Sequence, residues 1–207
     1  MKPTSTYSVV RVTDQLDVLA HISEALPRMW VADSPALQQF LTNELTYGLA
    51  LAVEAMAISD IAATSGIQTQ AFSTSVLQTL RKSVTKLESN GYPPATFVLH
   101  PNDREAIELA LLSTSAVEFQ GLPFDAQRRT LWGLAVTVTN AATAGTAHTL
   151  ASGAVGLNTD SQGVQIAWSE TSNADDWSKN LIRARCEGRY ATSVFQPLGV
   201  VQSDLTA

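Results

Sequence analysis

Cysteine and histidine are scarce in this sequence. Its 207 residues include one cysteine, Cys186, and three histidines, His21, His100 and His148, which lie far apart along the chain. A single thiol can form neither an intrachain disulfide nor a multi-thiolate metal site, and scattered histidines do not suggest a zinc centre. We therefore expect no metal, no cofactor and no disulfide, as in a protein assembled in a reducing cytoplasm.

Basic residues are also few. Thirteen Lys and Arg against nineteen Asp and Glu give a net charge of -6 and an isoelectric point near 5.0. This sign excludes nucleic-acid binding through a broad basic face. Two basic pairs, Arg81-Lys82 and Arg128-Arg129, could contact phosphates or an acidic neighbour, but solvated surface charges are the simpler interpretation. Any contact with DNA is expected to be local or indirect.

Long apolar runs are absent as well. The longest uninterrupted one, residues 48–53, ends at Glu54, well short of the roughly 20 residues of a membrane-spanning helix. The first residues lack the apolar core of a signal peptide, so we expect neither a membrane span nor a secretory signal. With 45% hydrophobic residues and a mean hydropathy of +0.05, the composition is that of one large or two small globular domains.

Recognisable catalytic motifs are missing. There is no Gly-x-Ser-x-Gly elbow, no Gly-x-Gly-x-x-Gly fingerprint and no phosphate-binding loop. Glu44 and Glu54 would lie about 15 Å apart on one helix, too far for a two-carboxylate mechanism. His100 is expected in a capped turn and Cys186 in the core. We expect no catalytic, cofactor-binding or metal-binding residue; an enzyme would require a deep pocket joining His100 or Cys186 to a carboxylate.

The clearest positive feature is a long apolar stripe. Ser34-Pro35 is a strong helix start, because serine can accept a hydrogen bond from the first turn and proline loses none at the first helical position. Apolar residues then recur at helical spacing and predict a helix over about 35–60, roughly 39 Å long, as a spine for the other elements. The stripe comprises Leu37, Leu41, Leu45, Leu49, Val53 and Met56.

Two further helices have recognisable ends. Ser73-Thr74-Ser75 starts one that presents an apolar face and stops at the left-handed cap Asn90-Gly91. Asn102 with Glu105 resembles a capping box for another helix, which extends to about Leu112.

Alternating residues predict several strands, so the fold class is α+β. Leu26-Pro27 is expected at a bend or an edge, Trp132-Gly133 at a tightly packed position, and residues 113–129 in a long loop. In the last strand Ile182, Ala184 and Cys186 should face inward. The expected strands are residues 7–13, 17–22, 96–100, 130–139, 164–168 and 181–186.

The order of these segments is informative. The most specific are Asp33-Ser34-Pro35-Ala36-Leu37 with residues 43–54, then residues 64–72, 77–87, 98–103, 130–136, 180–185 and 194–197. In this order they resemble the major capsid proteins of tailed bacteriophages, the family with the HK97-type fold. Each segment is weak alone, but together they extend from about Val18 to Leu205.

The resemblance implies an HK97-like capsid fold with a long spine helix, a peripheral domain and an axial domain. Residues 1–17 would be a remnant of an extended loop or N-terminal segment. Residues 18–72 and 158–196 would form the peripheral domain, and residues 73–157 and 197–207 the axial domain.

By the same resemblance the chain would be a major head protein, forming hexamers and pentamers of an icosahedral shell around double-stranded DNA. Its partners would be copies of itself, other phage head proteins such as portal and scaffold or maturation protease, and DNA bound non-specifically. It would be assembled in the bacterial host cytoplasm, reside in the virion, and could derive from a prophage. The alternative is the shell protein of an encapsulin-like compartment that encloses a cellular enzyme.

The sequence departs from the family pattern before the spine helix. Members usually carry an N-terminal arm and a two-stranded extended loop there, whereas one candidate strand, residues 7–13, precedes it here. Some members crosslink subunits through a lysine of that loop and an asparagine of the peripheral domain. Lys2 and Asn180 would be the corresponding residues, but without the full loop we do not expect the crosslink.

Overall fold

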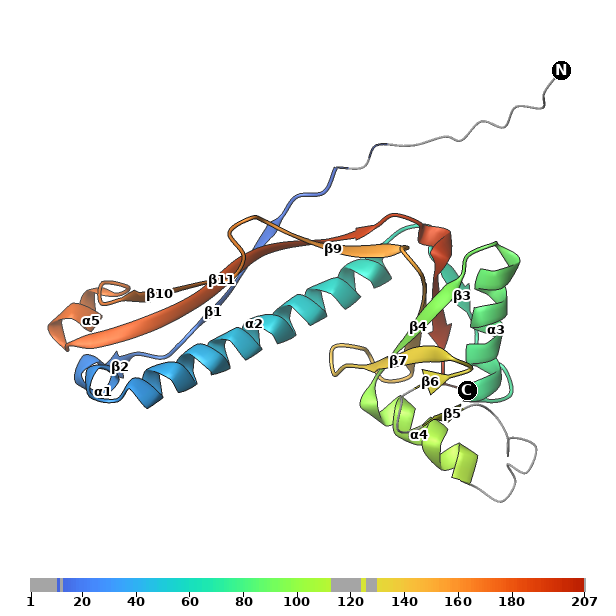
Figure 1. Cartoon of the computed structure of the whole chain (residues 1–207), viewed down its shortest axis with the longest axis horizontal. Helices are drawn as coiled ribbons and strands as arrows, with labels where there is room; N and C mark the ends of the chain where they lie inside the picture. Colours follow the sequence, from blue (N-terminus) through green and yellow to red (C-terminus); the bar gives the residue numbers. More distant parts are fainter. Residues whose placement is uncertain (1–10, 12, 113–123, 126–129, 207) are drawn as a thin grey trace.

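The computed structural model describes residues 11, 13–112, 124–125 and 130–206. The molecule is elongated: one sheet and one long helix form an arm, and a second sheet with two helices forms a rounder body at the end of that arm (Figure 1). Helices and strands occur in both parts, which confirms the expected α+β class.

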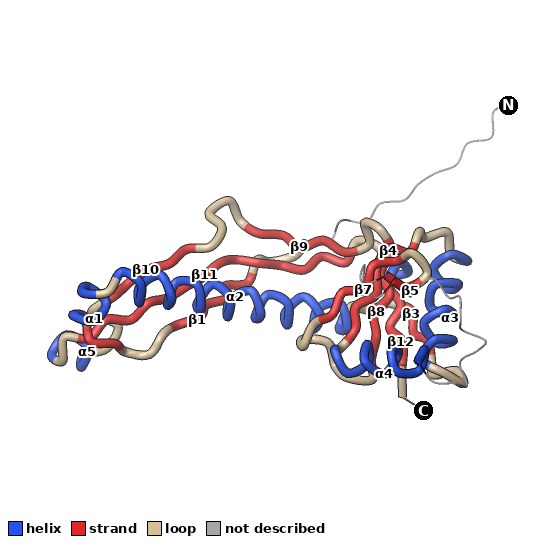
Figure 2. The backbone as a smooth tube through the Cα atoms, turned by 60° about the horizontal axis from the view of Figure 1, so that its bottom comes forward, coloured by secondary structure: helices blue, strands red, loops and turns tan. Residues whose placement is uncertain are grey.

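The arm has two layers. Strand β11 (Leu181–Val194) runs along it and pairs antiparallel with the other described strands of this sheet. Helix α2 (Pro35–Ala63) lies along one face of the sheet (Figure 2). The partners of β11 are β1 (Asp17–Ile22), β2 (Leu26–Pro27), β9 (Val155–Thr159) and β10 (Gln165–Ser169).

Helix α2 begins where the sequence predicts. Ser34 Oγ accepts a hydrogen bond from the Leu37 amide at 3.3 Å, and Pro35 is the first helical residue. The helix continues to Ala63, slightly beyond the expected end at Asp60. The predicted start of the helix is accurate because it depends on a local cap, whereas no comparable signal in the sequence marks the end of the helix.

The predicted stripe of α2 faces the sheet. Leu45 and Leu49 are 5% and 1% exposed and share a core cluster with Ala184 and Cys186 of β11. The inward orientation expected for Ala184 and Cys186 is therefore confirmed. These small side chains leave room for the leucines of the helix, so the two layers pack closely.

A glycine is required near the middle of α2. A Cβ atom at Gly48 would collide with the imidazole of His21, which lies on β1. Glycine inside a helix normally costs about 0.5–1 kcal/mol relative to alanine. At this position the helix and β1 can lie side by side only because the side chain is absent.

The body is built on a mixed sheet with the strand order β3-β12-β8-β4-β7-β6-β5. The pairs β3 with β12 and β4 with β7 are parallel, and the other neighbours are antiparallel. The strands are β3 (Gln68–Gln70), β4 (Pro94–Leu99), β5 (Phe124–Asp125), β6 (Thr130–Leu131), β7 (Leu134–Val138), β8 (Thr146–Ala151) and β12 (Val200–Asp204).

Two helices, α3 (Val76–Ser89) and α4 (Pro101–Leu112), complete the body. Leu80 and Val84 of α3 and Ile107 of α4 are buried in one cluster with Phe97 and Leu99 of β4. Both helices therefore contribute to a single core.

The ends of α3 match the sequence signals. Ser75 Oγ accepts a hydrogen bond from the Gln78 amide at 3.3 Å. At the other end Gly91 has a φ of 78°, and the Tyr92 amide donates to the Leu87 carbonyl at 3.0 Å. The predicted left-handed cap is thus present.

The start of α4 differs from the prediction. The helix begins at Pro101, and Nδ1 of His100 accepts a hydrogen bond from the Asn102 amide at 3.2 Å. The capping box of Asn102 and Glu105 is therefore wrong, because the imidazole of His100 acts as the acceptor at this end. His100 occupies a capped turn, as expected.

Residues 130–139 form two strands, not one. Trp132 and Gly133 have φ values of 51° and 78° and make a two-residue turn between β6 and β7. Two consecutive left-handed residues are typical of a tight hairpin, in which asparagine or aspartate usually precedes the glycine. Because tryptophan occupies the first position of the turn, the sequence pattern did not predict it.

Some of the predicted segments lie only partly within the described residues. The strand expected at residues 7–13 and the loop at residues 113–129 lie largely outside them. β3 falls within residues 18–72, which the resemblance assigned to the peripheral domain, and it pairs with β12 of the body. The sheets therefore divide the chain before residue 68. Leu26-Pro27, as β2, lies at an edge as expected.

Helix α2 is apolar on two sides. An 18-residue window has a mean hydropathy of 1.4, so by length and composition alone α2 could cross a membrane, contrary to the expectation from uninterrupted runs. Phe40, Tyr47 and Leu51 are 58%, 61% and 42% exposed. Their helical spacing places them on the side opposite Leu45 and Leu49. One side packs on the sheet, and the other is free in this chain.

Replacing Leu49 by alanine should lower the free energy of unfolding by about 2–5 kcal/mol, because it removes a fully buried side chain. Leu51→Ala, two residues away on the exposed side, should cost less than about 1 kcal/mol. Urea unfolding followed by circular dichroism measures both. Equal midpoints for the two variants would contradict the assigned orientation of α2.

Candidate assembly surface

The residues considered as possible catalytic groups are dispersed. Cys186 lies under α2 in the arm, whereas His100 caps α4 in the body. Glu44 and Glu54 are exposed on α2, and the carboxylate of Glu54 accepts a hydrogen bond from Thr139 Oγ1 at 2.9 Å, which links arm to body. The structure does not bring these four groups together.

The thiol of Cys186 is held in its neutral form. Burial raises its pKa, a hydrogen bond with Thr46 opposes this rise, and the charge of Glu187 adds to it. Because the thiolate is the reactive species, this thiol is a weak nucleophile and a weak metal ligand. Its contacts are packing contacts with the helix.

His148, which no sequence motif singles out, is a buried titratable group in the body. It is 3% exposed in β8, an interior strand of the sheet, and neither imidazole nitrogen has a hydrogen-bond partner among the described residues. Burial lowers the pKa of His148 below its ordinary value of 6.5. The imidazole is therefore neutral in the folded body at neutral pH.

The basic pair on α3 is engaged locally. Arg81 forms an exposed ion pair with Glu88 at 3.5 Å, and Nζ of Lys82 contacts Ser73 Oγ. These contacts agree with the interpretation as solvated surface charges. Arg128-Arg129 lies outside the described residues.

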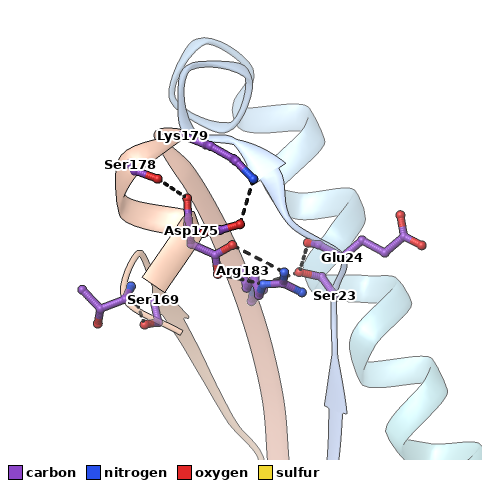
Figure 3. A network of polar contacts seen from close by, with 10 residues as sticks. Ser23, Glu24, Ser169, Asp175, Ser178, Lys179 and Arg183 are labelled. Atoms are coloured by element: carbon purple, nitrogen blue, oxygen red, sulfur yellow. Dashed lines mark hydrogen bonds and ion pairs between the residues drawn. The ribbon is translucent and has the colours of Figure 1, made fainter. Parts of the chain in front are cut away.

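The end of the arm far from the body carries two short helices, α1 (Arg28–Asp33) and α5 (Ala174–Ser178), and we call this region the distal tip (Figure 1). Arg183 of β11 donates from Nε to Asp176 Oδ2 at 2.9 Å and from Nη2 to Oδ1 at 3.4 Å. Asp176 is 2% exposed. This two-pronged ion pair, part of the network in Figure 3, fixes α5 to β11.

Helix α1 is fixed to the residues that flank β10 and β11 at this end of the arm. The Arg28 amide donates to the carbonyl of Asn180 at 3.0 Å, and the Arg28 guanidinium pairs with Glu170 at 3.1 Å. Asn180, the residue considered for a crosslink, has a φ of 55° just after α5; Lys2 lies outside the described residues. Arg28 and Trp177 line one small cleft of about 90 Å³. The two helices of the tip are therefore neighbours.

Large apolar side chains are exposed at this tip. Met29 and Trp30 are each 61% exposed on α1, and Trp177 is 70% exposed on α5. Together with the free side of α2, they give the arm apolar surface at its end and along its length. Exposed apolar surface of this kind is typical of protein–protein contacts.

A long helix packed on a sheet, joined to a body with a mixed sheet, defines the class of HK97-like capsid folds. The chain matches the family model described as "Phage capsid family" over residues 2–202. It therefore belongs to the phage capsid family.

Individual relatives are distant in sequence. The chain is 24% identical to the major capsid protein of Enterobacteria phage HK97 over 219 aligned positions, which cover all of this chain and 56% of that protein. The structure of the capsid of an empty GTA particle, calculated with C5 symmetry, superposes with a TM-score of 0.68 at 14% identity and covers 93% of this chain and 72% of the other. The structure from Mycobacterium phage Adephagia superposes with a TM-score of 0.67 at 12% identity and covers 93% of this chain and 73% of the other.

Because folding depresses the pKa of His148, the body should lose stability in acid. The unfolded chain takes up a proton as the pH falls through about 6.5, while the folded chain does not until lower pH. The contribution of neutral His148 to the free energy of unfolding is fully present above that pH. Below it, the free energy of unfolding decreases by up to about 1.4 kcal/mol per pH unit. Urea unfolding between about pH 8 and pH 5 measures this slope.

The variant His148→Gln tests this assignment. It removes the titrating group and should therefore reduce the loss of stability in acid relative to the wild type. The same slope in the wild type and in His148→Gln would show that protonation of His148 is not coupled to unfolding.

Breaking the ion pair of the distal tip should destabilise the arm. Asp176→Asn leaves the Arg183 guanidinium without its carboxylate and should lower Tm by several degrees. Asp175→Asn removes the exposed pair with Lys179 and should change Tm by less than about 1 °C. Calorimetry of both variants is the measurement, and equal Tm values would show that the Asp176 pair does not stabilise the arm.

Proposed function

We infer that this chain is a structural capsid protein that builds a shell from many copies of itself. The supporting observation is the exposure of large apolar side chains at the distal tip and along α2. An isolated monomer gains nothing from this exposure, whereas weak contacts repeated between many copies sum to a stable assembly. Membership of the phage capsid family supports the same role.

In the shell the copies would be grouped as hexamers and pentamers. The arm would form the peripheral domain, and the body would form the axial domain that points to the axis of each group. The structure of the GTA capsid, which shares the fold, was calculated with C5 symmetry, as a shell with five-fold groups of subunits permits. The elongated outline of the chain fits one subunit with its body near the axis and its tip at the rim (Figure 1).

The shell would enclose double-stranded DNA in a virion assembled in the bacterial host cytoplasm. A net charge of -6 disfavours tight DNA binding, so DNA would be retained by enclosure and touched non-specifically. Portal, scaffold and maturation protease would be the further partners of this assembly. A structural role of this kind requires no catalytic group from the chain.

Electron microscopy with light scattering tests the shell role. Particles purified from cells that naturally express the gene should be closed, icosahedral and rich in nuclease-protected DNA. A chain that stays monomeric at every concentration would contradict the role. Closed particles that contain an enzyme and no DNA would instead indicate the encapsulin-like compartment.

A further inference from the structure

The turn that ends α3 carries a chemically labile pair of residues. Asn90-Gly91 is the single Asn-Gly pair of the sequence. Asparagine is a labile residue, and glycine after it promotes loss of the side-chain amide, because no Cβ hinders the approach of the glycine nitrogen. Both residues are exposed, and a Cβ built on Gly91 would meet no atom within 4 Å. Water therefore has open access to this turn.

The reaction at such a pair is deamidation, and it needs only water. The backbone nitrogen of Gly91 attacks Cγ of Asn90, and the side-chain nitrogen leaves as ammonia together with the proton of the Gly91 amide. Water then adds to one carbonyl carbon of the cyclic imide and breaks its bond to nitrogen. Opening at the side-chain carbonyl gives aspartate, and opening at the backbone carbonyl gives isoaspartate. No oxidant or cofactor takes part.

The folded turn holds the Asn90 side chain away from the reactive position. Its Nδ2 donates hydrogen bonds to the Lys86 carbonyl at 2.9 Å and to Gln68 Oε1 at 3.0 Å. The first bond directs the side chain back along α3, and the second ties it to β3. Both bonds must break before Cγ can swing over the Gly91 nitrogen.

The backbone of the turn is also unsuited to the reaction. The Gly91 amide donates to the Glu88 carbonyl at 3.0 Å, and this is the proton that must leave when the imide forms. Asn90 has a ψ of 4°, which turns its Cα–Cβ bond out of the plane of the Gly91 amide. Closing the imide ring requires the bond and the amide to lie in one plane. Deamidation therefore requires the turn to open.

The product would weaken the turn that formed it. A carboxylate at position 90 lacks the two donated hydrogen bonds and adds a negative charge at the C-terminal end of a helix, beside Glu88, where negative charge is unfavourable. Leu87 in the same turn is fully buried and packs with Ile61 of α2 and Val201 of β12. The turn therefore supports the joint between arm and body.

We propose that Asn90 is a site of spontaneous deamidation whose rate is determined by opening of the last turn of α3. The folded cap suppresses the reaction, and opening of the turn permits it. Helix ends open more readily than the core of a protein, so the site reacts without global unfolding. The inference is independent of the shell role, because it depends only on contacts within one chain.

Peptide mapping by mass spectrometry tests the proposal on the full chain. The folded chain and the chain unfolded in guanidinium chloride are incubated at the same mildly alkaline pH and then digested with trypsin. The tryptic peptide of residues 87–104 contains both Asn90 and Asn102, which fragmentation distinguishes. Asn90 should react at least about 10-fold more slowly in the folded chain. In the unfolded chain it should react faster than Asn102, which precedes Asp103.

Two outcomes of this comparison would overturn the proposal. Equal rates at Asn90 in the folded and unfolded chains would show that the cap gives no protection. A rate at Asn90 no greater than that at Asn102 in the unfolded chain would show that the Asn-Gly pair is not the reactive site.

A matched pair of variants at Gln68 tests the contact with β3. Gln68→Ala and Gln68→Glu both lose the hydrogen bond that Gln68 donates to the Leu198 carbonyl, but only the glutamate keeps an oxygen that can accept from Asn90. Gln68→Ala should raise the rate in the folded chain about 3-fold, as expected for one lost hydrogen bond, and Gln68→Glu should leave it near the wild-type value. Equal rates in the two folded variants would overturn the protection assigned to this contact.

The variant Asn90→Asp reproduces one product of the reaction. It should lower Tm by about 2–4 °C, whereas Asn102→Asp places its charge in the first turn of α4, where negative charge is favourable, and should not lower Tm. Calorimetry measures both variants. An unchanged Tm in Asn90→Asp would overturn the predicted weakening of the turn.

Discussion

The packing of α2 against β11 is the contact on which the arm depends. Leu45 and Leu49 fill the space above Ala184 and Cys186, and every other described strand of the arm pairs with β11. Within the arm, the described residues give neither layer a second partner: one helix covers one face of one sheet. Because an isolated helix or a single uncovered sheet is marginal in water, each layer is stable only while the other is present.

The same geometry explains why the arm exposes so much apolar surface. A helix on a sheet buries one side of each layer and leaves the opposite sides free. The free side of α2 carries Phe40, Tyr47 and Leu51, which also raise the hydropathy of the helix toward that of a membrane span. The free side of the helix is therefore apolar surface that this chain does not cover itself.

Local signals in the sequence predict local structure well. The caps at Ser34 and Ser75 and the stripe through Leu49 predict the helices closely, because each depends on a few adjacent residues. The cap formed by the His100 imidazole and the turn at Trp132-Gly133 were not predicted. Histidine is not among the usual capping residues, and tryptophan stands where such a turn usually has asparagine or aspartate. The distal tip could not be predicted, since α1 is brought to the end of β11 that carries α5 only through the pairing of β2 with that strand.

The joint between arm and body determines where the distal tip points. The last turns of α2 enter the body, where Ile61 is 4% exposed and clusters with Ala154, Val200 and Val201. The hydrogen bond between Glu54 and Thr139 braces the same helix from outside. A helix packed into the core of the body cannot pivot without opening that core, because protein interiors are close-packed. Identical copies therefore present their tips at one fixed angle to their bodies, which is the geometric condition for a closed assembly of repeated contacts.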